Sequence, residues 1–259
     1  MSNLTSKEFW DSYWSEISLP CQVDLTLPFE RCLTRKVDYF LARYLADKKN
    51  ASIFEVGCAP GKWLAYLSRK HLLNPCGVEY LEQAHSATVR NLESLNLPSK
   101  GIIKSDFFEV EPHPIHDIVI SLGFIEHFDN VDNVIERHLH WLKPGGLLVL
   151  GVPNFSNLNG VIQKVLNKNV LDYHNTEIMK KEYFNHIADK FNLNPEFIDY
   201  LGSFEPVMFI GDQSAPNKLQ FTINISLQVI KKIRKFKFCD HLNSPLFSSY
   251  ILSIYRKSA

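Results

Sequence analysis

The stretch that decides the fold of this chain, residues 53–64, reads Ile53-Phe54-Glu55-Val56-Gly57-Cys58-Ala59-Pro60-Gly61-Lys62-Trp63-Leu64. An apolar run ends in an acid, a turn with two glycines follows, and an amphipathic stretch begins directly after it. This order is typical of a strand, a tight loop and the start of a helix, which together let backbone approach a nucleotide-like ligand. Gly57 and Gly61 suit positions where a side chain would obstruct the ligand or where φ is positive.

The spacing of the two glycines excludes two familiar phosphate-binding motifs. A dinucleotide site needs Gly-x-Gly-x-x-Gly, and a phosphate-binding loop needs Gly-x-x-x-x-Gly-Lys-Ser/Thr. This loop has only Gly57 and Gly61, and Trp63 follows Lys62 where Ser or Thr would be required. The pattern that fits is acid-x-Gly-x-x-x-Gly, which begins at Glu55.

From residue 51 onward, short apolar strands alternate with amphipathic helices. The strand candidates are rich in hydrophobic and β-branched residues and comprise residues 52–56, 76–80, 102–105, 117–121, 147–152, 196–201 and 250–255. The helix candidates between them are residues 61–72, 81–95, 131–142 and 180–191. This alternation predicts a Rossmann-like α/β fold: a doubly wound, mainly parallel seven-stranded sheet with helices on both faces. Ligands of such sheets bind beyond the carboxyl ends of the strands.

Residues 1–50 are predicted to form a helical cap on a main domain that spans residues 51–259. Residues 30–46 carry apolar side chains at helical spacing. An aromatic stripe precedes them and consists of Phe9, Trp10, Tyr13 and Trp14. This stripe predicts either a short helix packed by its own aromatic rings or a lid over a ligand. In the second case we expect Trp10, Tyr13 and Trp14 to contact the substrate.

Two segments interrupt the alternation of strands and helices. Residues 153–175 are predicted to form a long polar loop and residues 211–217 a second one. Because long loops at the ligand edge usually carry specificity, we expect substrate-recognition insertions near residues 153–178 and 205–245. Basic residues within 231–237 form one helical face, which is either a solvated surface or a docking patch for an acidic partner.

Charge and composition limit the partners that this chain is expected to have. Lys plus Arg and Asp plus Glu both number 28, so there is no overall electrostatic attraction to nucleic acid. No apolar stretch approaches the length of a membrane span, and the first residues do not resemble a signal peptide. The five scattered cysteines are typical of reduced thiols in an intracellular protein. We therefore expect a cytoplasmic protein that binds neither nucleic acid nor a membrane.

Acidic residues follow the second and third strand candidates. The second strand ends Gly77-Val78-Glu79-Tyr80, and a lone acid there can accept hydrogen bonds from both hydroxyls of a ribose. The third ends Ser105-Asp106-Phe107, where a carboxylate beside an aromatic ring suits the exocyclic amine of adenine. The alternative for Asp106 is the cap of a turn or helix.

The ordered series of motifs resembles that of class I S-adenosylmethionine-dependent methyltransferases that act on small molecules. The series reads Glu55-x-Gly57-x-x-x-Gly61, Glu79, Ser105-Asp106, Asp117-Ile118-Val119, Glu126-His127 and Leu142-Lys143-Pro144-Gly145-Gly146. Each piece is weak alone, but their order and spacing together are specific. The similarity covers residues 52–153, with weaker agreement as far as the last strand.

The resemblance implies S-adenosylmethionine as the cofactor, S-adenosylhomocysteine as the product and a small molecule as the acceptor. It also implies cofactor-binding roles for residues near the methionine moiety (Glu55, Gly57, Cys58, Gly61), the ribose (Glu79), the adenine (Tyr80, Asp106, Phe107) and the sulfonium (Ser121, Leu122). Phe124 after the fourth strand and Asn154 after the fifth are implied to contact the acceptor.

Two histidines are candidates for a general base, because the pKa of a histidine lies near working pH. His127 belongs to the Glu-His pair after the fourth strand, whose alternative role is to shape that loop. His174 precedes the 180–191 helix, as a histidine does in several similar small-molecule methyltransferases, and its alternative is a surface position. Some relatives hold magnesium with Glu-x-x-Glu-His, but Gly123 replaces the first acid here. We therefore expect no metal.

The sequence thus predicts a methyltransferase that transfers a methyl group to oxygen or nitrogen of a small metabolite by in-line displacement. The motif Asn/Asp-Pro-Pro-Tyr/Phe of amine methyltransferases acting on DNA bases is absent after the fourth strand, and there is no Pro-Cys nucleophile pair. The alternatives are a tRNA or protein methyltransferase that uses the 231–237 basic face, and a non-catalytic cofactor-binding partner subunit.

Overall fold

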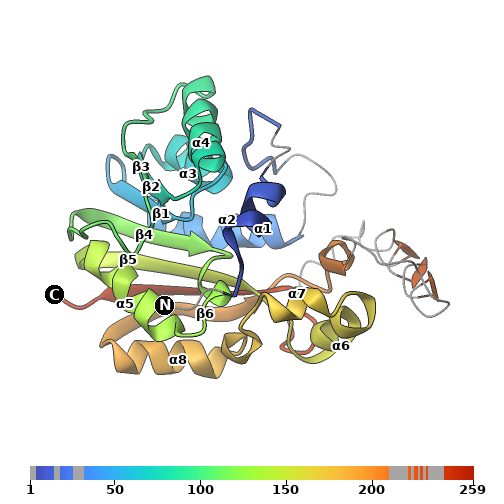
Figure 1. Ribbon diagram of the computed structural model, residues 1–259. Helices are drawn as coiled ribbons and strands as arrows, with labels where there is room; N and C mark the ends of the chain where they lie inside the picture. Colours follow the sequence, from blue (N-terminus) through green and yellow to red (C-terminus); the bar gives the residue numbers. More distant parts are fainter. Residues whose placement is uncertain are drawn as a thin grey trace.

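The structure of the chain is a computed structural model, shown in Figure 1. It describes residues 4–14, 18–25, 32–209 and 242–259, together with 221–222, 225–226, 228–229 and 232. The predicted loop at 211–217 lies outside these residues, as does the basic face at 231–237 except for Lys232, which is exposed. Within the described part, no helix has both the length and the apolar character needed to cross a membrane.

A seven-stranded sheet forms the centre of the molecule, as the alternation of strands and helices predicted. Its strands follow the order β3-β2-β1-β4-β5-β7-β6 (Figure 1). Their bounds are β1 Ser52–Val56, β2 Asn74–Glu79, β3 Ile102–Lys104, β4 His116–Leu122, β5 Leu142–Pro153, β6 Leu193–Leu201 and β7 Tyr250–Lys257. The first five strands are parallel, whereas β7 runs antiparallel between β5 and β6.

Helices cover both faces of the sheet because each strand buries apolar side chains on both of its sides. On one face, α2, α3 and α4 pack against alternate residues such as Ile53 and Ile118. On the other, α5 and α8 pack against Phe54 and Val119. The helices span α1 Lys7–Tyr13, α2 Cys32–Leu45, α3 Lys62–His71, α4 Glu82–Ser94, α5 Val131–Trp141, α6 Asn157–Leu166, α7 Asn169–Asp172 and α8 Lys181–Lys190. The described residues also form three short 3-10 turns: η1 Ile125–His127, η2 Thr176–Ile178 and η3 Pro206–Phe209.

The two N-terminal helices occupy different places. In α2, Val37, Leu41 and Leu45 are buried in the cluster on one face of the sheet, so this helix is part of the main fold. In contrast, α1 has no buried residue and lies near the carboxyl ends of the central strands (Figure 1). Only the aromatic stripe therefore lies where a lid would be required.

The prediction of a long loop over residues 153–175 is wrong, since α6 and α7 occupy most of it. The inner face of α6 buries two polar side chains, Asn159 and Gln163, while Leu158 and Val161 are exposed. Asn159 donates hydrogen bonds to the carbonyls of Asn154 and Ser248, at 3.0 Å each. The helix is therefore anchored by hydrogen bonds to a distant segment, which hydrophobic periodicity does not reveal.

Candidate active site

A cavity of about 750 Å³ opens at the carboxyl ends of the parallel strands. It is lined there by the residues that end or follow β1, β2, β3, β4 and β5, namely Gly57, Glu79, Ser105, Leu122 and Pro153. This is the edge at which ligands of doubly wound sheets bind. Its volume falls within the range of about 300–1,000 Å³ that small-molecule sites occupy.

The first loop of the cofactor half, at one end of this cavity, depends on its two glycines. Gly57 has φ +65°, and a Cβ there would lie 2.7 Å from the ring of Phe124. Gly61 has φ +80° at the start of α3, where a Cβ would lie 3.2 Å from Thr88. Gly57 therefore keeps the cavity open, whereas Gly61 serves the turn and the packing of α3 on α4.

Two carboxylates follow β2 and β3 in this half. Glu79 is only 5% exposed but lines the cavity, and its Oε1 accepts a hydrogen bond of 3.0 Å from the amide of Leu81. Burial raises the pKa of Glu79 above its ordinary value. Asp106 is exposed at the cavity edge and accepts from the amide of Phe108 at 2.8 Å, so it caps a turn. A carboxylate has two oxygens, so this cap remains compatible with an adenine contact.

Glu55 is the buried acid at the end of β1. It is 7% exposed, and its Oε2 has no hydrogen-bond partner among the described residues. Burial raises the pKa of Glu55 to about 8 because the charged form loses its hydration, although a backbone hydrogen bond from Leu64 acts in the opposite direction. A buried carboxylate oxygen without a partner is costly unless a ligand satisfies it, so Oε2 of Glu55 has the properties of an atom that binds a cation or a donor.

The sequence-predicted site residues fall into two groups. Those that line the cavity are Trp10, Tyr13, Trp14, Gly57, Glu79, Tyr80, Asp106, Phe107, Leu122, Phe124, His127 and His174. Those that the structure does not bring to the cavity wall are Glu55, Cys58, Gly61, Ser121 and Asn154.

Ser121 and Asn154 have clear structural partners instead. The hydroxyl of Ser121 donates to Nε2 of the buried His138 at 3.1 Å, because His138 Nδ1 already donates to a backbone carbonyl. Asn154 is fully buried and donates to the carbonyl of Ser248 at 2.8 Å. It therefore fastens the end of β5 to the segment before β7 and does not face the acceptor.

The acceptor half, at the other end of the cavity, is lined by the aromatic side chains of α1. The ring of Trp10 meets His127 edge-on at a centroid distance of 5.0 Å, and Phe9 lies 4.9 Å from Tyr173. The amide of Leu4 donates to the carbonyl of His127 at 2.8 Å, which holds the segment before α1 in place. These contacts place the aromatic stripe directly over the two predicted histidines.

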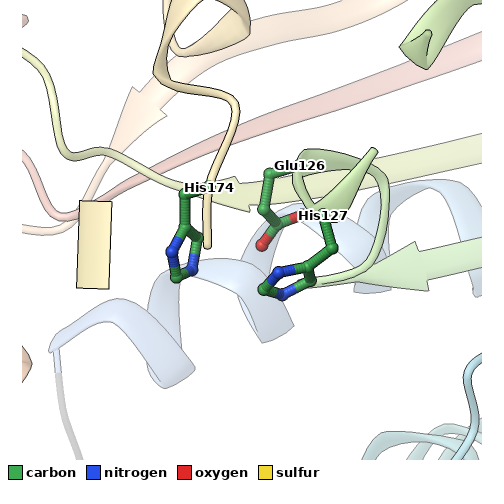
Figure 2. Close-up of side chains that lie close together, drawn as sticks. All are labelled: Glu126, His127 and His174. Atoms are coloured by element: carbon green, nitrogen blue, oxygen red, sulfur yellow. The ribbon is translucent and has the colours of Figure 1, made fainter. Parts of the chain in front are cut away.

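Hydrogen bonds between η1 and the residues after α7 bring His174 beside His127. The amide of Asn175 donates to the carbonyl of Glu126 at 2.6 Å. His127 Nδ1 and the carbonyl of Tyr173, 46 residues away, are 2.8 Å apart. The centroids of the His127 and His174 rings consequently lie 4.7 Å apart, and the carboxylate of Glu126 lies close to both rings (Figure 2).

The partners of the two histidines define their tautomers. A carbonyl only accepts, so Nδ1 of His127 donates to Tyr173, and Nδ1 of His174 donates to the carbonyl of Val170 at 2.6 Å. The lone pair of each neutral ring is then on Nε2. Burial, and secondarily the nearby His174, lowers the pKa of His127 to about 4, and burial also lowers the pKa of His174. Both imidazoles are therefore neutral at pH 7.

Sequence reasoning missed Glu126 as a site residue, although its pairing with His127 was noted. Glu126 is 1% exposed and lines the cavity, and burial raises its pKa to about 8. Its distance from His174 along the chain concealed the cluster. Phe9 belonged to the aromatic stripe but was not assigned a contact, and it too lines the cavity.

The charge of the cavity wall is uneven. Among the described residues that line it are four carboxylates, Glu79, Asp106, Glu109 and Glu126, and no lysine or arginine. Such a wall offers a phosphate or carboxylate no oppositely charged side chain, whereas it favours cations. Because burial raises the pKa of Glu126 to about 8, this carboxyl group is mostly protonated at pH 7 until a cation binds beside it.

Comparison with protein families agrees with this site. The family model of the methyltransferase domain matches residues 29–196, well over half of the chain. The chain therefore belongs to the methyltransferase domain family and is a class I S-adenosylmethionine-dependent methyltransferase, as its motifs predicted. The model ends before β6 is complete, so it does not cover the last part of the sheet.

Known relatives are distant. The "Probable (S)-tetrahydroprotoberberine N-methyltransferase 2" of Papaver bracteatum is 22% identical over 102 residues, which are 39% of this chain and 28% of that protein. This chain thus matches less than a third of the length of that curated relative.

Solved structures support the fold. A Galdieria sulphuraria protein, provisionally assigned as a sarcosine dimethylglycine methyltransferase, has a TM-score of 0.60 at 14% identity and covers 97% of each chain. A phosphoethanolamine N-methyltransferase of Haemonchus contortus, bound to phosphomonomethylethanolamine and S-adenosylhomocysteine, has a TM-score of 0.57 at 16% identity. It covers 87% of this chain and 53% of that one.

The residues present fit S-adenosylmethionine, the cofactor of this class. The orphaned Oε2 of the buried Glu55 can accept from a cationic amino group. Glu79 faces the cavity at the end of β2, where a carboxylate can accept hydrogen bonds from ribose hydroxyls, and Gly57, with its positive φ, places no side chain in the loop. These three features lie at the ends of β1 and β2, so they would act on one ligand.

Proposed function

We propose that this methyltransferase acts on oxygen or nitrogen of a small acceptor that carries no negative charge. One observation carries the proposal: the acceptor half continues from the cofactor half as one cavity, whose described wall has four carboxylates and no lysine or arginine. A small molecule fits this volume. A polynucleotide would require cationic side chains for its phosphates.

Bound S-adenosylmethionine supplies an electrophilic methyl group on a positively charged sulfur. In this proposal, Glu79 and Glu55 hold the two ends of the cofactor, and the aromatic rings of α1 exclude water and orient the acceptor. A lone pair of the acceptor then forms a bond to the methyl carbon while the carbon–sulfur bond breaks, with its electrons remaining on sulfur. Positioning alone can contribute about 7–11 kcal/mol to such a reaction.

The acceptor half suits two nucleophiles differently. A neutral amine needs no base, and the aromatic rings would stabilise the ammonium product through cation–π interactions of about 0.5–2 kcal/mol. A hydroxyl must lose its proton, and the lone pairs on Nε2 of His127 and His174 are the nearest acceptors. Either product is compatible with the negative wall.

The test is binding followed by turnover. Isothermal titration of the purified chain with S-adenosylmethionine and S-adenosylhomocysteine should show binding, and a panel of amines and alcohols should then be methylated. A matched panel of phosphorylated and carboxylated analogues should react at least about tenfold more slowly, since each buried like-charge contact costs on the order of 1 kcal/mol or more. A preference for the anionic analogues, or for tRNA, would refute the proposal.

A further inference from the structure

Three side chains from two distant parts of the sequence meet at the acceptor end of the cavity: Glu126, His127 and His174 (Figure 2). Each offers one potential ligand atom, and these atoms lie within 4.8 Å of one another. Two imidazoles and one carboxylate are the donor set of many catalytic zinc and non-haem iron sites. We propose that these three residues bind a divalent transition-metal ion.

The tautomer of both histidines suits metal binding. Nδ1 of His127 donates to the carbonyl of Tyr173 at 2.8 Å, and Nδ1 of His174 donates to the carbonyl of Val170 at 2.6 Å. Histidines that bind metals usually donate their other ring N–H to a carbonyl or carboxylate, which fixes the ring and the tautomer. In both residues Nε2 is thereby left with the lone pair that a metal requires.

Glu126 provides an independent indication of a ligand. The residue is 1% exposed, and its Oε2 has no hydrogen-bond partner among the described residues. A buried carboxylate oxygen without a partner is unfavourable, and a metal ion would satisfy it. Figure 2 shows this carboxylate pointing toward the space between the two rings.

The geometry leaves room for an ion and for the acceptor. Ligand atoms about 2.1 Å from one ion lie about 3.0–3.4 Å apart. Starting from separations of up to 4.8 Å, the three side chains therefore close in on one another by up to about 1.4–1.8 Å when they bind the ion. No side chain fills the space beside Gly123, where a Cβ would lie 3.7 Å from Glu126 Oε1. Three protein ligands leave coordination positions open, as in catalytic rather than structural sites.

The chemistry of the ligands and of the wall favours a particular class of ion. Two imidazole nitrogens favour Zn²⁺, Fe²⁺ or Co²⁺ over Mg²⁺, which prefers oxygen ligands. The carboxylates of the cavity wall, unaccompanied by lysine or arginine among the described lining residues, concentrate cations there. The expectation of no metal considered only acids near position 123, whereas His174 enters from another part of the chain.

The role of the ion rests on the proposed function. An acceptor hydroxyl bound at an open position would be acidified by the ion and would lose its proton to bulk water. Its oxygen would then form the bond to the methyl carbon as the carbon–sulfur bond breaks. In this arrangement the two histidines act as ligands, and no protein base is needed.

Metal binding can be tested without turnover. The full chain is freed of metal with a chelator and titrated with Co²⁺ and with Zn²⁺ by calorimetry, and the visible absorption of bound Co²⁺ reports its ligands. We expect one ion per chain, and at least about tenfold weaker binding for His174→Ala and for the near-isosteric Glu126→Gln. The control His186→Ala, which removes an exposed histidine of α8, should bind as the wild type does.

The possible outcomes separate this proposal from the proposed function. Absence of saturable Co²⁺ and Zn²⁺ binding, or binding that neither variant weakens while circular dichroism shows both to be folded, overturns the metal site. Binding of tetramethylammonium without binding of Co²⁺ would also overturn it, because the cation attracted to the wall would then be an ammonium group. A parallel titration with S-adenosylmethionine tests the cofactor half. If the chain binds only the metal ion or only S-adenosylmethionine, the conclusion about the other ligand is not affected.

Discussion

The cofactor half and the acceptor half of the cavity are built in different ways. The residues assigned to the cofactor half lie at the carboxyl ends of strands β1 to β4 or in the loops that follow them. The acceptor half combines α1, η1 and the residues after α7, which are far apart in sequence. A binding loop attached to a strand can therefore be recognised from a local motif, whereas a site made of three separate segments requires the tertiary structure.

Both halves are nevertheless associated with a buried glutamate that has an unsatisfied carboxylate oxygen. Glu126 lines the acceptor half and Glu55 lies next to the cofactor half, behind Gly57. Among the described residues neither Oε2 has a hydrogen-bond partner, and burial raises the pKa of both carboxyl groups to about 8. Both carboxylates are costly to the fold, so both are expected to be satisfied by ligands. If substitutions in one half reduce only cofactor binding and substitutions in the other reduce only turnover, the two halves act independently.

The largest effect is expected in the acceptor half. His127→Ala should lower turnover by about 10²–10⁴-fold, the usual contribution of a group that moves a proton or holds the reacting atoms. Because His127 lies beside the acceptor and not at the cofactor loops, the affinity for S-adenosylmethionine should change little. Stopped assays with a methyl-labelled cofactor measure the turnover, and calorimetry measures the affinity.

The outcome also decides between two roles of His127. Unchanged turnover would show that this histidine only shapes the η1 loop. A matched control is His140→Ala, which removes an exposed histidine of α5 and should leave both quantities unchanged.

The next largest effect is expected in the cofactor half. Glu79→Ala should weaken S-adenosylmethionine binding by about 1–3 kcal/mol, or roughly 5–150-fold, because a ribose hydroxyl loses a charged partner. Glu82→Ala is a suitable control, since Glu82 is the exposed acid that begins α4. Equal affinity of wild type and Glu79→Ala in the titration would mean that the ribose lies elsewhere.

Parts of the fold with a local sequence signal were predicted well, whereas parts that depend on contacts between distant segments were not. Strand β1 has the predicted bounds, because a five-residue apolar strand buried on both faces has a clear signal. Strand β5 begins at Leu142 instead of residue 147, because Leu142 pairs with His116 before a register shift that sequence does not encode locally. The α6 helix was missed because it buries Asn159 and Gln163 and exposes apolar residues.

The lining of the cavity was predictable where a residue belongs to a local sequence motif at the end of a strand. Gly57, Glu79 and Asp106 line the cavity, as expected for residues that end or follow a strand, and their contacts with the cofactor stay a prediction. Ser121 was expected near the cofactor, but its hydroxyl is hydrogen-bonded to the ring of His138. The alternation of side chains along a strand does not reveal this partner. The cluster around Glu126 was missed because Asn175 and Tyr173 join it through backbone hydrogen bonds, which any residue type could make.

A pH series would sharpen the role of Glu55. In the free protein Glu55 is protonated below pH 8, and a bound cationic amino group would favour the carboxylate. Cofactor binding near neutral pH should therefore release a proton, and affinity should rise with pH until the amino group of the cofactor begins to lose its own proton near pH 8. Between pH 6 and pH 7 the affinity should rise about tenfold, because Glu55 with a pKa of about 8 is mostly protonated over this range.

The variant Glu55→Gln isolates this contribution. Its affinity should be low at pH 7 and nearly independent of pH between pH 6 and pH 7, and calorimetry in two buffers of different ionisation enthalpy measures the released proton. Stability gives a second readout: the folded wild type binds more protons than the unfolded chain between pH 4.5 and 8, so its unfolding free energy falls as pH rises through this window. Glu55→Gln should show a smaller fall, and an identical one would contradict the raised pKa.

The smallest effect is expected for the aromatic cover, and it tests most directly whether the two halves are separate. Trp10→Ala should raise KM for the acceptor by about 3–10-fold, since one aromatic contact contributes about 0.5–1.5 kcal/mol beyond its buried area. The melting temperature should hardly change, because α1 buries no residue in the core. Tyr39→Ala, which removes an exposed aromatic of α2 outside the cavity wall, is the control. If Trp10→Ala weakened S-adenosylmethionine binding as much as acceptor binding, α1 would close over both ligands, and the cavity would act as one unit and not as two halves.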